Sequence, residues 1–394
     1  MNKPVLPMSS LSLKLPTADR SIGTYRLAAL RTFPAKLEGT LNRVAFSAAH
    51  VVADPLADND PWLTAAIDWD RTIAFREHVW DLGLGVAEAM DTAQRGMGLD
   101  WPLAHELIGR SLKSAGPQAS RIFSGCGTDH LQPVEARSVD DVVRAYLEQL
   151  HAIQKLGGRV ILMASRALVR VAKSPDDYVK VYGRVLNEAE KPVILHWLGE
   201  MFDPALKGYW GAEDFSATAR NCLAVISNNS AKIDGIKISL LDAEKEIIFR
   251  RQLPANVKMY TGDDFNYADL IAGDTQGYSH ALLGIFAAIA PAAAAALTAL
   301  AKGNTKKFHK IFGPTVPLSR LIFQAPTQYY KTGIVFLAWL NGHQDHFIMV
   351  GGAQSARPLP YFTETFKLAD QAGLLRDPEL AVKRMKTLLA LYGQ

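Results

Sequence analysis

The feature that most constrains this chain is a repeating order of short apolar segments, each followed by a polar loop and a helix-length amphipathic stretch. We expect eight strands, at residues 44–48, 85–89, 121–124, 159–164, 192–196, 235–238, 257–261 and 277–283. Amphipathic helical patterns lie between them, at residues 69–82, 101–115, 139–156, 175–189, 215–227 and 243–253. Apolar runs that alternate with helices in this way are typical of parallel strands covered by helices.

Eight such units in about 260 residues match the length of one (β/α)8 TIM barrel. A doubly wound open sheet is the competing arrangement, but no GxGxxG turn follows the first strand, and eight units favour closure. We therefore predict an α/β fold with a (β/α)8 barrel over residues 43–303, an N-terminal extension over 1–42 and a helical C-terminal extension over 304–394. Short alternating segments at 12–15 and 24–27 are expected to pair as a hairpin, and C-terminal helices are expected at 327–340, 361–371 and 378–391.

The composition narrows the class of protein. A hydrophobic fraction of 48% and a charged fraction of 21% are typical of a globular protein. The net charge is +4, and no run of five or more basic residues occurs, which argues against a nucleic-acid or anionic-membrane surface. Cys126 and Cys222 lack CxxC spacing, and the N-terminus lacks the apolar core of a signal peptide. We therefore expect a cytoplasmic protein without a disulfide framework or structural zinc site.

One uncharged segment, residues 281–301, is long enough to span a bilayer, for which about 20 apolar residues suffice. It is rich in alanine, which is only weakly hydrophobic, and Pro291 interrupts it. Its flanks also fit a buried strand that leads into a helix. We interpret the segment as core, with a membrane span as the alternative.

Lys237 lies within an apolar strand pattern, IDGIKISLLD at residues 233–242. Burial of an ammonium group is unfavourable, so a buried lysine usually has a lowered pKa. A neutral amine at a strand end is what Schiff-base chemistry on a carbonyl substrate requires. The alternative is a lysine at a strand edge whose ammonium group reaches water.

Polar residues follow most of the predicted strands. In a (β/α)8 barrel, reacting groups lie at the C-terminal ends of strands and in the loops after them. That rule selects Ser47, His50, Glu88, Asp91, Thr92, Ser124, Thr128, Asp129, His130, Ser165, Arg166, His196, Trp197, Glu200, Lys237, Ser239, Thr261, Gly262, Asp263, Asp264 and His280. So many polar strand ends favour an enzyme with a small-molecule substrate.

Four segments carry a resemblance to a known family. They are KPVILHWLGEMFDP at 191–204, DGIKISLLD at 234–242, the block from 257 to 291 that contains TGDDF, and SARPLP at 355–360. Together they resemble the dihydrodipicolinate synthase/N-acetylneuraminate lyase superfamily of class I aldolases, and most closely its divergent DUF993-type branch. The order and spacing of the segments make the resemblance specific across residues 43–365.

The resemblance implies that Lys237 is the nucleophile, which forms an imine with a substrate ketone and needs no further cofactor. The imine would act as an electron sink while an adjacent C–C bond breaks or forms. Asp263 and Asp264 would lie near the mouth of the barrel, either at the substrate or as caps of the loop. A dimer or tetramer, without nucleic acid or membrane as a partner, is the expected assembly.

Two departures from the family pattern bear on the substrate. His196 stands where the family has a proton-relaying tyrosine, either as an acid/base group or as a buried structural histidine. The family's GTTGE loop is replaced by AEAMDTAQRG at 87–96, with Glu88 and Asp91 where an anion is held. Carboxylates repel a substrate carboxylate and accept hydrogen bonds from hydroxyls, which favours a keto-sugar or another carbohydrate-derived carbonyl compound.

We therefore expect a class I lyase or aldolase with Lys237 as nucleophile and His196 as proton shuttle. The expected substrate-binding residues are Glu88, Asp91, Thr92, Trp197, Ser239, Asp263, Asp264 and His280. Two alternatives stay open. A divalent metal held by residues from the set Glu88, Asp91, His196, His50, His130 and His280 would support a barrel isomerase, epimerase or aldolase. A barrel retained as a sensor or scaffold would have no reaction.

Overall fold

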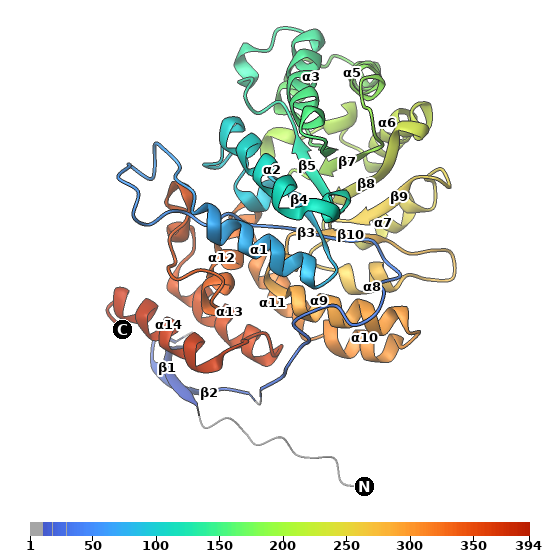
Figure 1. Cartoon of the computed structure of the whole chain (residues 1–394). Coiled ribbons are helices and arrows are strands. Elements are labelled where there is room, and N and C mark those ends of the chain that lie inside the picture. The colour runs from blue at the N-terminus through green and yellow to red at the C-terminus, as the bar shows by residue number, and fades with distance from the viewer. Residues whose placement is uncertain (1–10, 18, 29) are drawn as a thin grey trace.

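The computed structural model describes residues 11–17, 19–28 and 30–394 (Figure 1). Eight parallel strands close into a barrel in the order β10-β3-β4-β5-β6-β7-β8-β9. Their bounds are β3 (Ala45–Ala48), β4 (Gly85–Glu88), β5 (Ile122–Cys126), β6 (Arg159–Leu162), β7 (Val193–Leu198), β8 (Ile233–Ser239), β9 (Lys258–Thr261) and β10 (His280–Leu283). The predicted (β/α)8 barrel is confirmed, and the open sheet is excluded because β10 pairs with both β9 and β3.

Helices follow the strands and cover the outside of the barrel. They are α1 (Trp69–Asp81), α2 (Trp101–Ala115), α3 (Val139–Lys155), α4 (Arg166–Val171), α5 (Pro175–Asn187), α6 (Phe215–Asn228), α7 (Ala243–Arg250), α8 (Tyr267–Ala272) and α9 (Phe286–Ala301). Asp or Ser side chains accept a backbone N–H at the start of α1, α2, α3, α6 and α7. These caps satisfy backbone donors that lack a partner within the helix. The six-residue helices α4 and α8 were not predicted, because they are too short to show a helical period.

Short 3₁₀ helices connect several of these elements. They are η1 (Asp91–Ala93), η2 (Gly116–Arg121), η3 (Pro133–Glu135), η4 (Pro204–Leu206), η5 (Tyr209–Gly211), η6 (Ser230–Lys232), η7 (Thr327–Tyr329) and η8 (Val350–Ala356).

Bulky side chains fill the barrel interior toward the N-terminal ends of the strands. The rings of Phe46 and Phe123 meet edge to face at 5.3 Å, and Phe46 lies 5.8 Å from the ring of Tyr260. A Cβ at Gly85 would overlap the Phe46 ring, so the missing side chain makes room for this layer. Since the interior is packed from below, an open site is expected at the C-terminal ends of the strands.

The C-terminal helices are α10 (Thr305–Phe312), α11 (Thr315–Ile322), α12 (Tyr330–Leu340), α13 (Leu359–Gln371) and α14 (Pro378–Leu391). Every residue of α12 is buried. This helix contacts α9, α13, α14 and η1. A helix that is buried on all sides belongs to the core of the protein, so α12 is part of the packing around the barrel rather than an appended surface element.

The N-terminal hairpin is confirmed as an antiparallel pair of β1 (Ser12–Pro16) and β2 (Ile22–Arg26). Leu13 and Leu15 are buried in the same apolar cluster as α13 and α14. The Tyr25 hydroxyl donates to Asp370 on α13 at 2.8 Å. The N-terminal hairpin thus packs against the last two helices, and Figure 1 shows β1 beside α14.

The uncharged segment 281–301 forms most of β10 and all of α9. Pro291 lies inside α9, and Ile289 just before it has non-helical backbone angles, so the helix is kinked. Among the described residues, no helix is both long enough and apolar enough to cross a membrane.

Glu88 requires a correction. Its neighbour Ala87 faces the barrel interior, so Glu88 points outward, because successive side chains of a strand alternate. Arg76 of α1 holds the carboxylate with two hydrogen bonds of 2.8 and 3.0 Å, and Ser111 of α2 donates a third at 2.5 Å. Both partners of the ion pair are fully buried. Glu88 therefore joins the strand to its helices and does not face a substrate.

Replacement of Glu88 by alanine would leave the Arg76 guanidinium buried without its counter-charge. We expect Glu88→Ala to lower the free energy of unfolding by about 3–5 kcal/mol, measured by urea denaturation. Glu106→Ala is the matched control, because Glu106 pairs with Arg110 on the exposed face of α2. The control should lose no more than about 1 kcal/mol. Equal losses in the two variants would contradict the structural role of Glu88.

Candidate active site

Lys237 lies near the C-terminal end of β8 with its side chain in the barrel interior. The side chain is 7% exposed. Burial lowers the pKa of the amine below its usual range, while the carboxylates of Asp91 and Asp264 oppose that shift. Within the described part of the chain, no hydrogen bond or ion pair holds the Nζ atom. The result is a desolvated amine without a fixed partner.

Gly262, in the loop after β9, makes room for this lysine. A Cβ at Gly262 would lie 2.7 Å from the Cε of Lys237 and 2.7 Å from the carbonyl oxygen of Ile238. Any other residue would therefore displace the lysine or the neighbouring strand. Steric crowding by Lys237 and β8 thus explains why a glycine stands at this position of the TGDDF segment, whatever the role of the two aspartates that follow it.

The two aspartates of that segment have different surroundings. Asp263 accepts hydrogen bonds from the backbone N–H groups of Phe265 and Asn266 and from the Asn266 side chain, so it caps its own loop. Asp264 is buried near Lys237 and accepts a hydrogen bond from the N–H of Ile285 at 2.8 Å. Burial raises the pKa of Asp264 to about 7. Asp264 is therefore a group that can exchange a proton near neutral pH.

His196 is the lateral neighbour of Lys237, because the two residues are paired in the register of β7 and β8. Its Nε2 lies 3.3 Å from the Oγ of Ser239, which is also buried and inward. Burial, and secondarily the charge of Lys237, lower the pKa of His196 well below its usual value. The imidazole is thus neutral at physiological pH and serves as a hydrogen-bonding group beside the amine.

A hydroxyl pair joins the barrel to the C-terminal helices. Thr92, in η1 after β4, lies with its Oγ1 2.8 Å from the Oη of Tyr330 at the start of α12. Both residues are buried. Burial raises the pKa of Tyr330 well above its usual value, and Asp91 and Asp264 add to the effect. The charges of Asp91 and Asp264 raise the pKa of both Lys237 and Tyr330, so the amine and the phenol lie close to the same two carboxylates.

Cationic groups surround the rest of the mouth. Arg95 holds Asp129 through two hydrogen bonds of 2.7 and 2.8 Å, and Arg166 pairs with Asp203 at 2.6 Å. Lys331 on α12 is buried, and burial lowers its pKa to about 8. A cavity of about 270 Å³ opens here, lined by residues that include Asp91, Arg95, Asp129, Arg166, His196 and Asp203.

Two further residues expected at the site lie elsewhere. Trp197 points out of the barrel, opposite to His196, and stacks on Phe215 of α6 at 6.1 Å. His280 is the first residue of β10 and accepts a hydrogen bond from the N–H of Val44, so it lies at the N-terminal end of the barrel. Contrary to expectation, neither Trp197 nor His280 lies at the mouth of the barrel, so neither is positioned to bind a substrate there.

The residues considered as metal ligands do not converge. Glu88 is bound outside the barrel wall, and His280 lies at its far end. His50 packs against Phe75 of α1 at 4.4 Å. Over the described ranges, no group of three or more His, Cys, Asp or Glu side chains is arranged to hold a metal ion. The geometry therefore does not assemble the donor set that the metal alternative needs.

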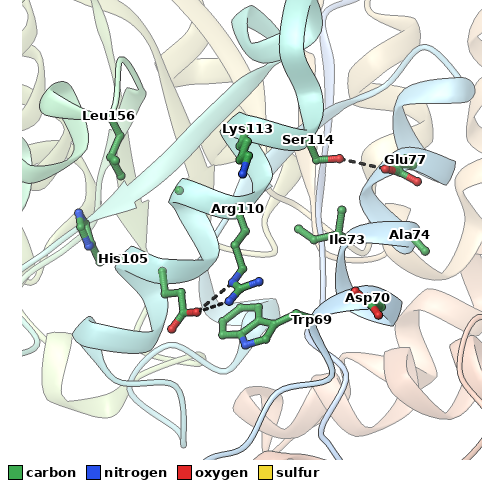
Figure 2. Close-up of a pocket in the computed structure, with 12 residues that line it drawn as sticks. Trp69, Asp70, Ile73, Ala74, Glu77, His105, Arg110, Lys113, Ser114 and Leu156 are labelled. Atoms are coloured by element: carbon green, nitrogen blue, oxygen red, sulfur yellow. Dashed lines mark hydrogen bonds and ion pairs between the residues drawn. The ribbon is translucent and has the colours of Figure 1, made fainter.

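A wide surface hollow of about 830 Å³ lies between α1 and α2, on the outside of the barrel (Figure 2). Some of its charged groups have partners within the hollow. Arg110 contacts Glu106, and Ser114 donates to Glu77 at 2.9 Å, as the dashed lines in Figure 2 show. Because these groups lie on helices and not at strand ends, we place the candidate site at the barrel mouth.

Tyr330 and Lys331 are the groups that sequence reasoning missed. They lie on a helix that follows the barrel by some thirty residues, so the rule of strand ends does not select them. The helix pattern over 327–340 was predicted, but neither its depth nor its contact with η1 has a signature in the sequence.

Comparison with known proteins agrees with this architecture. The family model described as "Protein of unknown function (DUF993)" matches residues 13–394. No curated protein sequence matches the chain significantly.

Solved structures share the fold. Dihydrodipicolinate synthase from Aquifex aeolicus superposes with a TM-score of 0.61 at 12% identity, over 84% of this chain and 99% of that one. A prophage protein of the dihydrodipicolinic acid synthase family from E. coli K12, solved with pyruvate, has a TM-score of 0.65 at 14% identity, over 85% and 100%. The enzyme from Acinetobacter baumannii, also solved with pyruvate, has a TM-score of 0.59 at 16% identity, over 85% and 100%. This chain therefore belongs to the DUF993 family, whose member here has the fold of dihydrodipicolinate synthase.

Proposed function

We propose that this protein is a class I lyase or aldolase that forms an imine between Lys237 and a small carbonyl substrate. The observation that carries the proposal is the desolvated Lys237 amine at a strand end, without a fixed partner and with a lowered pKa. Burial disfavours the charged form of a lysine, and a buried group with a shifted pKa is a candidate for a functional role. The likeness to dihydrodipicolinate synthases supports this function through the shared fold.

The reaction begins with the neutral form of the Lys237 amine, which a lowered pKa makes more accessible. The Nζ of Lys237 adds to the carbonyl carbon, and the resulting carbinolamine gains a proton on oxygen and loses water to give a protonated imine. The imine then accepts the electron pair of the C–C bond next to it as that bond breaks. The departing fragment leaves as a carbonyl compound after its hydroxyl proton is removed. Protonation of the remaining enamine and hydrolysis return the free lysine and the second product.

We consider three candidates near Lys237 for moving these protons: Asp264, the Thr92–Tyr330 pair and His196. The pKa of Asp264, raised to about 7 by burial, allows it to gain or lose a proton near neutrality. The Thr92–Tyr330 hydroxyl pair can pass a proton from one oxygen to the other. His196 is a weaker base than expected because burial lowers its pKa. We therefore assign proton transfer to Asp264 and the hydroxyl pair, with His196 and Ser239 as hydrogen-bonding groups.

The charged groups at the mouth support a particular substrate class. Glu88 does not contribute a negative charge there, so Asp91 is the remaining carboxylate of the 87–96 loop near Lys237. Lys331 on α12 adds a buried amine whose protonated form is favoured by Asp91 and Asp203. This combination suits a carbohydrate-derived carbonyl compound whose hydroxyls donate to Asp91, and it admits a substrate carboxylate near Lys331. We therefore include sugar-derived keto acids beside neutral keto-sugars.

Borohydride trapping tests the imine. Incubation with sodium borohydride and a panel of pyruvate, sugar-derived keto acids and keto-sugars should add to the protein the mass of one substrate minus one oxygen atom. Peptide mapping should place the adduct on Lys237, and Lys237→Arg should give none. Lys180→Arg is the matched control, since Lys180 is exposed on α5, and it should keep the adduct. A substrate that is turned over without any trapped adduct would overturn the proposed chemistry.

Tyr330→Phe tests the hydroxyl pair. Removal of the Oη deletes the partner of Thr92 and should lower turnover of a substrate found by trapping by about 100-fold, which is typical of a lost acid/base group. Tyr329→Phe is the control, since this neighbouring tyrosine is only partly buried. Its turnover should stay near that of the unmodified protein. Wild-type turnover in Tyr330→Phe, with an unchanged melting temperature, would exclude a role for the pair.

A further inference from the structure

A second cavity, of about 250 Å³, lies away from the barrel mouth. Three helices and three connecting segments enclose it: α1, α9, α12, residues 31–35, residues 341–343 and residues 373–376. An engineered protein cavity of about 150 Å³ suffices to bind benzene, so this one can hold a ring with a polar substituent.

The body of the cavity is apolar. Small side chains of α9, including Ala287 and Ala288, leave the space open, and Pro291 borders it where the helix is kinked. Phe33 on the N-terminal segment and Leu337 on α12 complete the apolar lining. These surfaces favour the apolar part of a ligand over a fully hydrated ion.

Nitrogen-bearing side chains converge at one side of the cavity. The imidazoles of His78 on α1 and His343 after α12 lie 4.7 Å apart. The Nε2 of His78 is buried and has no hydrogen-bond partner in the part of the chain that the structure describes. Arg31 and Arg376 also line the cavity, and among the described residues neither guanidinium group has an ion pair. Four nitrogen-bearing side chains thus border one side of the cavity.

The electrostatics of this group are unbalanced. Burial and Arg376 lower the pKa of His78 to about 4, opposed by Asp81. Burial, His78, Arg376 and His50 lower the pKa of His343 well below its usual value. Asp81 itself has Lys36 at 3.6 Å. The imidazoles are therefore neutral, while Arg31 and Arg376 are exposed to solvent and have no ion pair among the described residues.

This cavity is separate from the candidate active site. Tyr330 begins α12 beside Thr92, whereas Leu337, Ala338 and Asn341 near the end of the same helix border the cavity. A rise of 1.5 Å per residue places Leu337 about 10 Å along the helix from Tyr330, and the linings of the two cavities share no residue. A ligand in one space therefore does not fill the other.

We propose that this cavity is a binding site for a small organic anion, a carboxylate carried on an apolar ring-sized body. The carboxylate lies at Arg31 and Arg376 and accepts hydrogen bonds from His78 and His343, and the body of the ligand fills the space beside α9. Charge-assisted hydrogen bonds of this kind are about twice as strong as neutral ones. The apolar walls distinguish such a ligand from inorganic phosphate or sulfate.

Benzoate is the probe that tests this site, with binding to the full-length protein measured by titration calorimetry. Benzoate should bind, and benzyl alcohol and inorganic sulfate should bind at least about tenfold more weakly. Equal binding of benzyl alcohol would overturn the anion site, as would the absence of any benzoate binding in the millimolar range.

Variants then locate the site. Arg376→Gln should weaken benzoate binding about tenfold, because it removes one cation from the rim. Ala288→Phe should abolish binding by filling the cavity. Arg137→Gln is the control, since Arg137 is exposed on the loop before α3, and it should bind benzoate as the unmodified protein does. If benzoate binds unchanged to Arg376→Gln and Ala288→Phe, it lies elsewhere and the proposal fails.

Discussion

The removal of one lysine amine from water is the constraint on which the candidate site depends. Lys237 lies inside a closed barrel whose lower layers are filled by aromatic and aliphatic side chains, and the residue is buried. Two buried or half-buried carboxylates, Asp91 and Asp264, limit the loss of basicity without forming an ion pair with it. Gly262 supplies the space that the side chain occupies. The amine of Lys237 thus has space around it and no ion pair, which leaves it available for reaction with a substrate.

The helices after the barrel also contribute to the candidate site. A helix buried on every side, α12, brings Tyr330 and Lys331 to the mouth, and its packing partners α13 and α14 also hold the N-terminal hairpin. The mouth is therefore built by segments that are distant in sequence. In this chain, a barrel alone would lack the phenol that meets Thr92 and the cation beside Asp91. The C-terminal part thus completes the site as well as the core.

The sequence was sufficient to predict the barrel because its strand and helix periods repeat eight times, and each repeat supports the others. The residues of the site were harder to predict, since a shift of one position along a strand decides whether a side chain faces the barrel interior or the surrounding helices. The side chains of Lys237 and Ser239 point into the barrel, whereas those of Glu88 and Trp197 point outward and pack against helices. His280 was misplaced because β10 begins there. Tyr330 depends on tertiary packing that no local pattern records.

The central claim is that burial lowers the pKa of the Lys237 amine below that of an ordinary lysine, and its titration tests this most directly. The rate at which trace acetic anhydride labels Lys237 can be followed across pH by mass spectrometry of the peptide, with the urea-unfolded protein as reference. In the folded protein, labelling should reach half its maximum at a pH clearly below the ordinary lysine value of 10.5, because burial disfavours the ammonium form. The unfolded protein should titrate near that ordinary value. Equal titration in the folded and unfolded states, or a higher midpoint in the folded state, would contradict the account.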